Sequence, residues 1–394
     1  MANRPAWLKE TSLQQLFAAT QAMGGEARAV GGAVRDFLLG RDGGDVDVAS
    51  SLPPEATMAI AQAEGWKAIP TGLAHGTVTL VLPERVVEIT TLRRDVETDG
   101  RHALVEYTSD FAEDAARRDF TINALYMDAA GGIHDYTDGQ KDLKTQRVRF
   151  IGDAGTRIAE DALRILRFFR FMATHGKPPA DADALAACAA AREQIANLSG
   201  ERIAAEMRKL LCAPNPAYAL AQMAEAGIPA MITESPWVPV QVEILLQLET
   251  LYHLAVNPWV RLLAMIEPGM RSETAYWVSE RWKLSRAEQQ MLQALAQHAT
   301  RVDPARVKEW LRSEPRGQVL GRIALAALNS DDAVATDALM LLAQDWEVPG
   351  FPVTAKDLLT RGYEQGRALG EALAALEKRW VESDYQLTRE QLLA

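Results

Sequence analysis

The strongest constraint on the fold lies in residues 30–50, which read VGGAVRDFLLGRDGGDVDVAS. A short β-rich segment at 27–30 leads into the pair Gly31-Gly32, and a helical pattern follows as far as Leu39. Residues 45–49, DVDVA, then alternate polar and apolar side chains with a period of two, which is typical of a half-buried strand. Strand, glycine pair, helix and strand in this order predict a mixed α/β unit.

The same segment combines two features that suit a phosphate-bearing substrate. Asp45 and Asp47 are two residues apart on the expected strand, so their side chains leave the same face. Such carboxylates can hold Mg²⁺, which commonly takes one or two carboxylates and completes its shell with substrate phosphates. Backbone N–H groups at Gly31-Gly32 and the charge of Arg35 can hold phosphate oxygens where the helix starts. Each feature alone also fits a solvated sheet face or a tight turn, and the chain has neither a P-loop nor a G-x-G-x-x-G fingerprint here.

The rest of the chain divides into two regions with different sequence patterns. Up to about residue 150 the pattern is mixed, with a helix from Pro53-Pro54 and a hairpin predicted from two β-rich runs at 76–82 and 85–91. Residues 92–110 are polar and charged, and we expect a loop there. Beyond residue 150 the strand patterns nearly vanish and the apolar spacing becomes helical. We therefore predict an α+β protein with regions at 1–150, 151–213 and 214–394, of which the last two are all-α.

Composition excludes several classes of protein. The 394 residues are 48% hydrophobic and 24% charged, which is typical of a globular chain. Two cysteines and six scattered histidines exclude a disulfide scaffold and give no zinc-site spacing, and so few cysteines suit a reducing cytoplasm. No apolar run reaches the ~18 residues of a membrane span, and the first residues lack the apolar core of a secretory signal. We therefore expect a cytoplasmic protein with no membrane partner and no obligate protein partner.

Five sequence motifs, in order, resemble those of one enzyme family. GGAVRDFLLG followed by DVD resembles the first motif of the nucleotidyltransferase superfamily, and more narrowly that of class II tRNA CCA-adding enzymes and bacterial poly(A) polymerases. The other four are RRDFTINAL at 117–125, DGQKDL at 138–143, EDALRILRFFRF at 160–171 and SGERIAAE at 199–206. The resemblance implies a nucleotidyltransferase-type mixed-sheet head followed by an all-α neck, body and tail, with base recognition in the neck and tRNA binding in the body and tail.

The resemblance also implies a reaction, the template-independent addition of C, C and A to the 3′ end of tRNA from CTP and ATP, with release of pyrophosphate. Asp45 and Asp47 are then the ligands of two Mg²⁺ ions, which activate the attacking 3′-hydroxyl and neutralise charge on the leaving phosphates. Glu88, in VVEITT, is the candidate third carboxylate, because the sheet can bring it beside Asp47. An outward-pointing strand glutamate is the alternative interpretation.

The RRD run in the second motif is the candidate for holding the incoming nucleotide. By resemblance, Arg118 and Asp119 hold its ribose and phosphates, with Asn123 nearby. A hydrogen bond from the ribose 2′-hydroxyl to the Asp119 carboxylate would help to select ribonucleotides. Outside this context such a run is commonly surface ion pairing, which contributes under about 1 kcal/mol.

Asp161 and Arg164 lie three residues apart in the fourth motif. On a continuous helix they project together, and a local salt bridge is the ordinary outcome. The alternative is a protein template, in which the carboxylate accepts from the exocyclic amine of C or A and the guanidinium donates to the adjacent ring acceptor. U and G present a carbonyl instead and leave buried groups unpaired, which can discriminate by ~10⁴. Arg167 and Arg170 continue the helix at three-residue steps and form a basic edge for triphosphate oxygens.

Several other functions remain open at this point. Poly(A) polymerases of the same superfamily usually carry a basic stretch after the second helix, where this chain has TGLAHGTVTLV. Partial enzymes add only CC or only A. In the family that the chain resembles, shortened forms of the segment at 91–108 go with C-only addition, so its full length here favours complete synthesis; the alternative is a charged hairpin extension with no role. A non-catalytic RNA-binding protein would not need the Asp45/Asp47 and Asp161/Arg164 pairs, and a small-molecule nucleotidyltransferase would not need the long helical appendage.

The net charge of −11 argues by itself against nucleic acid as a partner. The charge is, however, unevenly distributed. Residues 141–170 contain eight basic and four acidic side chains, and residues 271–322 contain ten basic and six acidic ones. These segments can face RNA phosphates, so tRNA remains the expected partner, bound with modest and salt-sensitive affinity.

Overall fold

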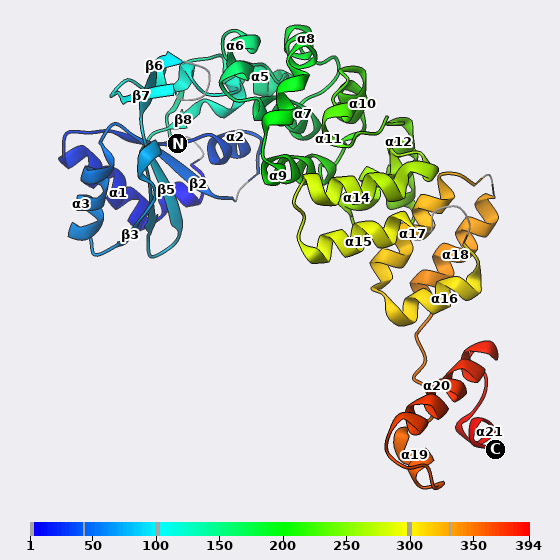
Figure 1. The fold of residues 1–394 in the computed structure, drawn as a ribbon. Helices are drawn as coiled ribbons and strands as arrows, with labels where there is room; N and C mark the ends of the chain where they lie inside the picture. Colours follow the sequence, from blue (N-terminus) through cyan, green and yellow to red (C-terminus); the bar gives the residue numbers. More distant parts are fainter. Residues whose placement is uncertain (1–3, 42–43, 99–102, 298–301, 331) are drawn as a thin grey trace. The chain divides into compact units, whose positions relative to one another are not determined.

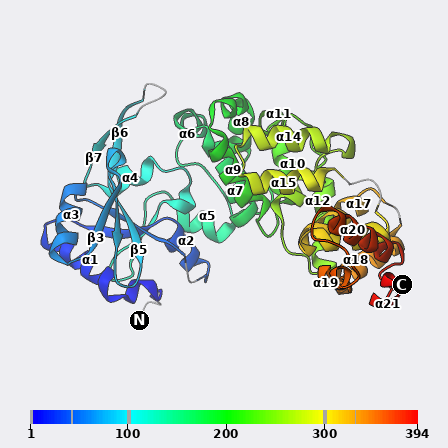
Figure 2. The ribbon, with the colours of Figure 1, turned by 60° about the horizontal axis from the view of Figure 1, so that its bottom comes forward.

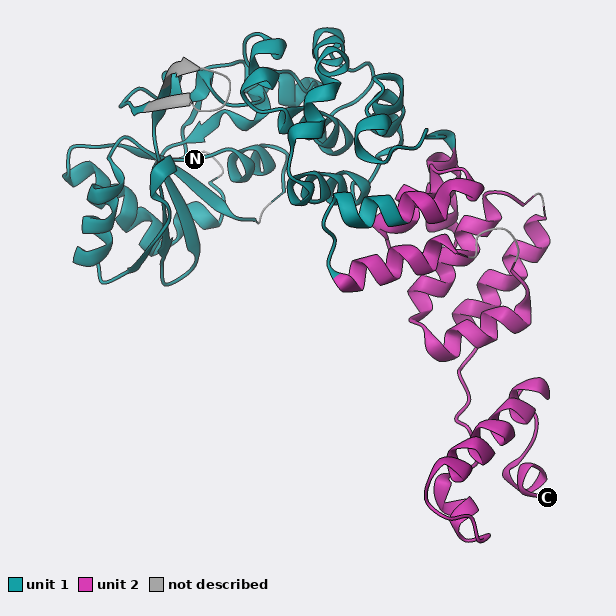
Figure 3. Cartoon of the chain, viewed as in Figure 1, with its two compact units in different colours: residues 1–240, 276–285 teal, residues 241–275, 286–394 magenta. Residues whose placement is uncertain are grey.

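The computed structural model describes residues 4–41, 44–98, 103–297, 302–330 and 332–394. The chain forms two compact units, residues 1–240 with 276–285 and residues 241–275 with 286–394 (Figure 3). Within the described residues, all β-strands belong to the first unit and the second is helical. This arrangement confirms the α+β class and the amino-terminal position of the mixed sheet.

The head of the first unit is built around a seven-stranded sheet with the strand order β3-β4-β5-β2-β1-β8-β9 (Figures 1 and 2). Its strands are β1 (Ala27–Val30), β2 (Val46–Ser50), β3 (Lys67–Gly72), β4 (Thr77–Val81), β5 (Val86–Thr91), β8 (Leu125–Met127) and β9 (Ile133–Asp135). Neighbouring strands run antiparallel except β2 and β5, which are parallel. The predicted hairpin at 76–91 is confirmed as β4 and β5.

Four helices accompany this sheet: α1 (Thr11–Ala22), α2 (Gly32–Leu38), α3 (Pro54–Ala63) and α4 (Phe111–Ala116). Helices α1 and α3 pack beside each other and against strands of the sheet (Figure 1). Gly31, with a φ of 72°, supplies the left-handed backbone that turns the chain from β1 into α2, a conformation that glycine adopts without strain. Helix α3 starts with Pro54 at its first position, where the missing N–H has no helical acceptor.

Residues 92–110 differ from the predicted loop. They form an antiparallel hairpin of β6 (Arg93–Thr98) and β7 (Ala103–Tyr107), which is a separate two-stranded sheet. The tip of the predicted loop, residues 99–102, lies outside the described residues. An exposed two-stranded ribbon forms its backbone hydrogen bonds without needing the alternation of apolar and polar residues that identifies a core strand. The polar sequence therefore did not distinguish this hairpin from a loop.

The remainder of the first unit is helical, and its helices are α5 (Gly139–Thr145), α6 (Ala154–Glu160), α7 (Leu163–His175), α8 (Ala182–Ala190), α9 (Gly200–Leu211), α10 (Ala217–Glu225) and α11 (Pro229–Ile232). The aromatic side chains of α7, Phe168, Phe169 and Phe171, are buried in the core. Phe168 is fully buried and stacks on Phe150 with ring centroids 5.7 Å apart. The Ser199 hydroxyl accepts the N–H of Arg202 at 3.4 Å and so caps the start of α9.

The other helices are α12 (Val240–Leu251), α13 (Pro258–Ala264), α14 (Arg271–Arg281), α15 (Arg286–Ala296), α16 (Pro304–Ser313), α17 (Arg316–Ala327), α18 (Ala333–Asp345), α19 (Ala355–Leu359), α20 (Arg367–Glu382) and α21 (Arg389–Leu393). In the second unit the buried Arg261 pairs with Glu249 at 2.6 Å. The last helices share a small apolar cluster around Trp380. Among the described residues, no helix combines the length and the apolar character needed to cross a bilayer.

Candidate active site

A hollow of about 340 Å³ opens in the first unit, over the central strands β2 and β5 of the sheet and beside the start of α7. We call it the central hollow. Its lining residues are Val30, Asp47, Val48, Glu88, Thr90, Arg93, Arg117, Arg118, Asp119, Asp161, Arg164 and Arg167. This lining includes four carboxylates and five guanidinium groups, a composition that suits an anionic substrate bound together with a cation.

Carboxylates gather near the start of β2. Asp47 and Glu88 are register partners in the parallel pair β2–β5, so their side chains leave the same face of the sheet, as predicted for a neighbouring strand. Asp45 lies just before β2 and is exposed. Burial raises the pKa of Asp47 above its usual value, and the negative charges of Glu88 and Asp45 raise it further against the opposing effect of Arg118. A cation among these groups would relieve their repulsion.

The donor set fits a hard divalent cation that is shared with a substrate. In the part of the chain that the structure describes, no three His, Cys, Asp or Glu side chains form a complete metal site. Asp45 and Asp47 offer carboxylate oxygens, the ligands that hard cations prefer. A cation that keeps waters and takes phosphate oxygens needs only one or two such carboxylates.

The glycine pair forms the turn from β1 into α2. The Gly31 N–H donates to the carbonyl of Leu125 at 3.1 Å, so this N–H is engaged within the fold and is not the bare donor that we predicted. Leu125 on β8 accepts this N–H because the chain continues along β1 as far as Gly31 before it turns into α2. A Cβ on Gly31 would lie 4.0 Å from Nη1 of Arg118, so this guanidinium sits next to the turn from which Gly32 starts α2.

Asp119 is the centre of a chain of polar contacts. Its Oδ1 accepts from Phe120 N at 2.8 Å and from Asn123 Nδ2 at 3.1 Å, and its Oδ2 accepts from Arg167 Nε at 2.7 Å. Burial favours the neutral acid, but the charge of Arg167 and these hydrogen bonds outweigh it and hold the pKa of Asp119 below its usual value. Asn123 Oδ1 in turn accepts from Arg35 Nη1 at 2.6 Å, so α2 and α7 are both joined to the RRD segment.

Asp161 and Arg164 both line the central hollow, but the continuous helix that we predicted through them is wrong. Asp161 is extended, with φ −154° and ψ 105°, and separates α6 from α7. Its Oδ1 accepts the N–H of Leu163 at 3.1 Å and its Oδ2 pairs with Arg202 at 2.7 Å, whereas Arg164 pairs with Glu160. Aspartate competes for nearby backbone N–H groups in this way, and here Asp161 ends α6 and accepts the N–H of the first residue of α7.

Comparisons with known proteins place this site in a family. Residues 27–149 match the Poly A polymerase head domain, and residues 181–234 match the probable RNA and SrmB-binding site of polymerase A. The mitochondrial CCA tRNA nucleotidyltransferase 1 of Danio rerio is 34% identical over 385 residues, which are 94% of this chain and 86% of that protein. This chain belongs to the CCA tRNA nucleotidyltransferase family. The resemblance carried by the five motifs is thereby confirmed.

Further members of the CCA tRNA nucleotidyltransferase family support this assignment. A CCA-adding enzyme of Geobacillus thermodenitrificans is 41% identical over 220 residues, which are 54% of this chain and 53% of that protein. The crystal structure of the Bacillus stearothermophilus CCA-adding enzyme in complex with CTP is similar with a TM-score of 0.71 and 29% identity, over 95% of this chain and 93% of that one. The likeness therefore extends into the carboxyl-terminal helices, in which no motif was found.

In this member of the CCA tRNA nucleotidyltransferase family, six predicted site residues do not line the central hollow: Gly31, Gly32, Arg35, Asp45, Asn123 and Arg170. Arg170 is paired with a residue of α9 instead. Its Nε donates to Glu206 at 2.5 Å, and its guanidinium lies 4.0 Å from the centroid of the Phe171 ring. Its role toward the triphosphate stays a prediction. Conversely, Arg93 and Arg117 line the hollow although sequence reasoning did not select them. Arg117 could have been found from its place in the RRD run.

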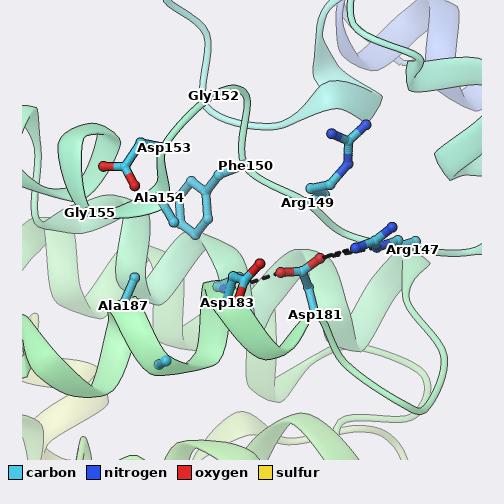
Figure 4. A pocket seen from close by; sticks show the side chains of 12 residues that line it. Arg147, Arg149, Phe150, Gly152, Asp153, Ala154, Gly155, Asp181, Asp183 and Ala187 are labelled. Atoms are coloured by element: carbon cyan, nitrogen blue, oxygen red, sulfur yellow. Dashed lines mark hydrogen bonds and ion pairs between the residues drawn. The ribbon is translucent and has the colours of Figure 1, made fainter.

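A second hollow, of about 580 Å³, lies between the segment 147–155 and the start of α8 (Figure 4). Its arginines are engaged by carboxylates, because Arg147 pairs with Asp181 at 2.6 Å and Arg149 pairs with Asp142 at 2.9 Å. Arginines of the central hollow are paired with carboxylates as well, but the lining of the second hollow contains none of the predicted site residues.

Proposed function

We propose that this member of the CCA tRNA nucleotidyltransferase family adds C, C and A to the 3′ end of tRNA without a nucleic-acid template. CTP and ATP are the substrates and pyrophosphate is released. One observation carries the proposal: a single hollow joins the Asp47 carboxylate, a set of arginines and the residues Asp161 and Arg164. It is supported by a relative named as a CCA tRNA nucleotidyltransferase over 94% of this chain, and by a similar structure described with CTP.

We assign cation binding to Asp45 and Asp47, and Mg²⁺ to this position, because two carboxylates suit an ion whose other ligands are water and phosphate oxygens. When bound, the ion supplies activation of the attacking 3′-hydroxyl and neutralisation of charge on the leaving pyrophosphate. Glu88 is the proposed third carboxylate, since it is the register partner of Asp47. Its negative charge adds to the potential that draws the cation into the hollow.

The nucleotide's phosphates and ribose are assigned to the turn and the RRD segment. Gly31 and Gly32 leave space for phosphate oxygens beside the Arg118 guanidinium, which donates hydrogen bonds to them. Asp119 is ionised because of its low pKa and can accept from the ribose 2′-hydroxyl, a group that distinguishes ribonucleotides. Asn123 holds Asp119 in place through its amide N–H.

Base selection is assigned to Asp161 and Arg164 on either side of the start of α7. An ionised carboxylate has about four acceptor positions, so Asp161 can keep Leu163 N–H and Arg202 and still accept the amine of C or A. Arg164 supplies the complementary donor. We assign the neighbouring charges of Arg167, Arg35 and Arg170 to the triphosphate side of the nucleotide.

The deciding experiment offers tRNA transcripts that end before CCA, after C and after CC, with CTP and ATP singly and together. We expect complete CCA ends, no incorporation by Asp45→Ala or in a chelator, and recovery from the chelator with Mg²⁺. Asp183→Ala, an exposed aspartate on α8 outside the central hollow, is the matched control and should incorporate normally.

Other products would contradict the proposal in distinguishable ways. Long A tails would indicate a poly(A) polymerase, the activity named in the matched head-domain family. Products that stop at CC, or that receive only A, would indicate a partial enzyme. Binding of tRNA without incorporation from any nucleotide would indicate a non-catalytic RNA-binding protein.

We also propose a cytoplasmic location, on the basis of the two cysteines. Three relatives are named mitochondrial, so the mitochondrion is the alternative location. Cell fractionation with an antibody against the chain decides, and enrichment in mitochondria would contradict the cytoplasmic assignment.

A further inference from the structure

A buried carboxylate lies behind the central hollow and takes no part in the proposed reaction. Asp114, in α4, is only 1% exposed. Its Oδ2 accepts from the Tyr126 hydroxyl at 2.8 Å and from Arg118 Nε at 3.1 Å, while its Oδ1 accepts from Arg117 Nη2 at 2.9 Å. Burial opposes its ionisation, but the charges of Arg118 and Arg117 keep its pKa below the usual value. Asp114 is therefore a fixed negative charge directed at two arginines of the hollow.

These contacts use one edge of the Arg118 guanidinium. Nε donates to Asp114 and, at 3.1 Å, to the Tyr126 hydroxyl oxygen, and Nη2 lies 3.0 Å from Asp114 Oδ2. The remaining nitrogen, Nη1, is the one nearest to the Gly31 turn, 4.0 Å from where a Cβ on Gly31 would lie. The charge also reaches Asp47, whose pKa it lowers against the effect of burial and of the other carboxylates. One edge of Arg118 is thus held by the protein and the other faces the hollow.

Tyr126 completes this arrangement from the sheet. It lies on β8, is fully buried, and is the register partner of Val30, the residue before the glycine pair. Burial raises the pKa of Tyr126, so the phenol stays neutral and keeps the proton that it donates to Asp114. Its ring packs edge-on to Phe111 with centroids 5.5 Å apart. Packing on all sides fixes the position of the hydroxyl, which in turn fixes its two partners.

We propose that Asp114 and Tyr126 are positioning residues, which hold Arg118 beside the Gly31 turn so that it can bind the triphosphate of the incoming nucleotide. This inference rests on the proposed function. A free arginine side chain has several rotatable bonds, and ordering it when the nucleotide binds would weaken binding. A displacement of about 1 Å at a reacting group can lower the rate by about 10²-fold. The alternative is that the buried pair only stabilises the fold.

The test is a double-mutant cycle on kcat and KM for CTP with tRNA lacking its CCA end. We expect Asp114→Asn to raise the KM for CTP by about 10- to 100-fold with a smaller change in kcat, and to change KM by less than about 2-fold in an Arg118→Ala background. Tyr126→Phe keeps the packed ring and should raise KM by about 3- to 10-fold. Binding of cytidine, which has no phosphates, should be unchanged in both variants.

Asp181→Asn is the matched control, because it alters another buried aspartate that pairs with an arginine in the same unit, away from the central hollow. It should leave the KM for CTP unchanged. Equal penalties of Asp114→Asn with and without Arg118, or equal effects of Asp114→Asn and Asp181→Asn, would overturn the proposal. If Asp114→Asn fails to fold, Tyr126→Phe decides, and an unchanged KM in that variant is the overturning result. Failure of the wild-type chain to use CTP would instead overturn the proposed function.

Discussion

Replacement of Asp161 by asparagine tests base selection with little disturbance of the fold. In the structure, Asp161 Oδ1 accepts the N–H of Leu163 at 3.1 Å, and an asparagine oxygen can keep this hydrogen bond. The other side-chain atom then changes from a carboxylate oxygen to an NH₂ group, which is a donor. A donor opposes the exocyclic amine of C or A but matches the carbonyl of U or G. The variant should therefore accept UTP and GTP at the expense of CTP and ATP.

The size of the effect follows from the interaction that is lost. A hydrogen bond to a charged acceptor contributes about 1.5–3 kcal/mol. Since 1.4 kcal/mol is a factor of ten, the preference for CTP over UTP should fall by roughly 10- to 150-fold. The cost in stability is smaller, because the ion pair lost to Arg202 joins side chains that are 34% and 47% exposed, and such pairs contribute under about 1 kcal/mol.

The assay is incorporation of each nucleotide alone, with kcat/KM for CTP and UTP measured on tRNA that lacks its CCA end. Arg202→Gln breaks the same ion pair and leaves the carboxylate, so it should keep the wild-type preference. A folded Asp161→Asn protein with an unchanged ratio of CTP to UTP would refute the assignment of base selection to this carboxylate.

Three further predictions concern stability. The pKa of Asp119 is held below its usual value, so its contribution to folding is present at neutral pH and is lost as the pH falls below about 4; denaturation at pH 3–7 should show this loss, and Asp119→Asn should lessen the pH dependence. A Cβ on Gly200 would overlap a backbone carbonyl, so Gly200→Ala should destabilise the first unit by about 1–3 kcal/mol, whereas Gly155→Ala, which meets only a side-chain oxygen at 3.4 Å, should not. Glu249→Gln removes the countercharge of Arg261, which is 2% exposed, and should lower the free energy of unfolding in urea by about 3–5 kcal/mol; a loss under about 1 kcal/mol would contradict the buried pair.

The parts of the fold that depend on local chemistry could be predicted from the sequence. The strand, glycine pair and helix at 27–38 are found because a left-handed glycine, a helical pattern and an alternating strand each leave a signal within a few residues. The pairing of Asp47 with Glu88 also followed, since two β-rich runs in one sheet bring like positions together.

The parts of the site that depend on partners distant in the sequence could not be predicted. Asp161 has a helix-compatible spacing to Arg164, yet its side chain accepts the N–H of Leu163 and pairs with Arg202 from α9. Arg170 has the right spacing for a basic edge but is drawn to Glu206. Asp114 has i,i+3 and i,i+4 spacing to Arg117 and Arg118, so these two ion pairs had a local signal, but no spacing rule joins Asp114 to Tyr126 on β8.

The parallel pairing of β2 with β5 sets the order in which the site can form during synthesis. Parallel neighbours need a crossover connection, and here the chain makes α3, β3 and β4 before β5 can lie beside β2. The pairing of β1 with its second neighbour, β8, comes later still, because residues about 100 positions apart in the sequence must meet and such contacts form slowly. A chain released before residue 127 would therefore carry both aspartates that we propose as cation ligands and an open strand edge, but no pocket for a nucleotide.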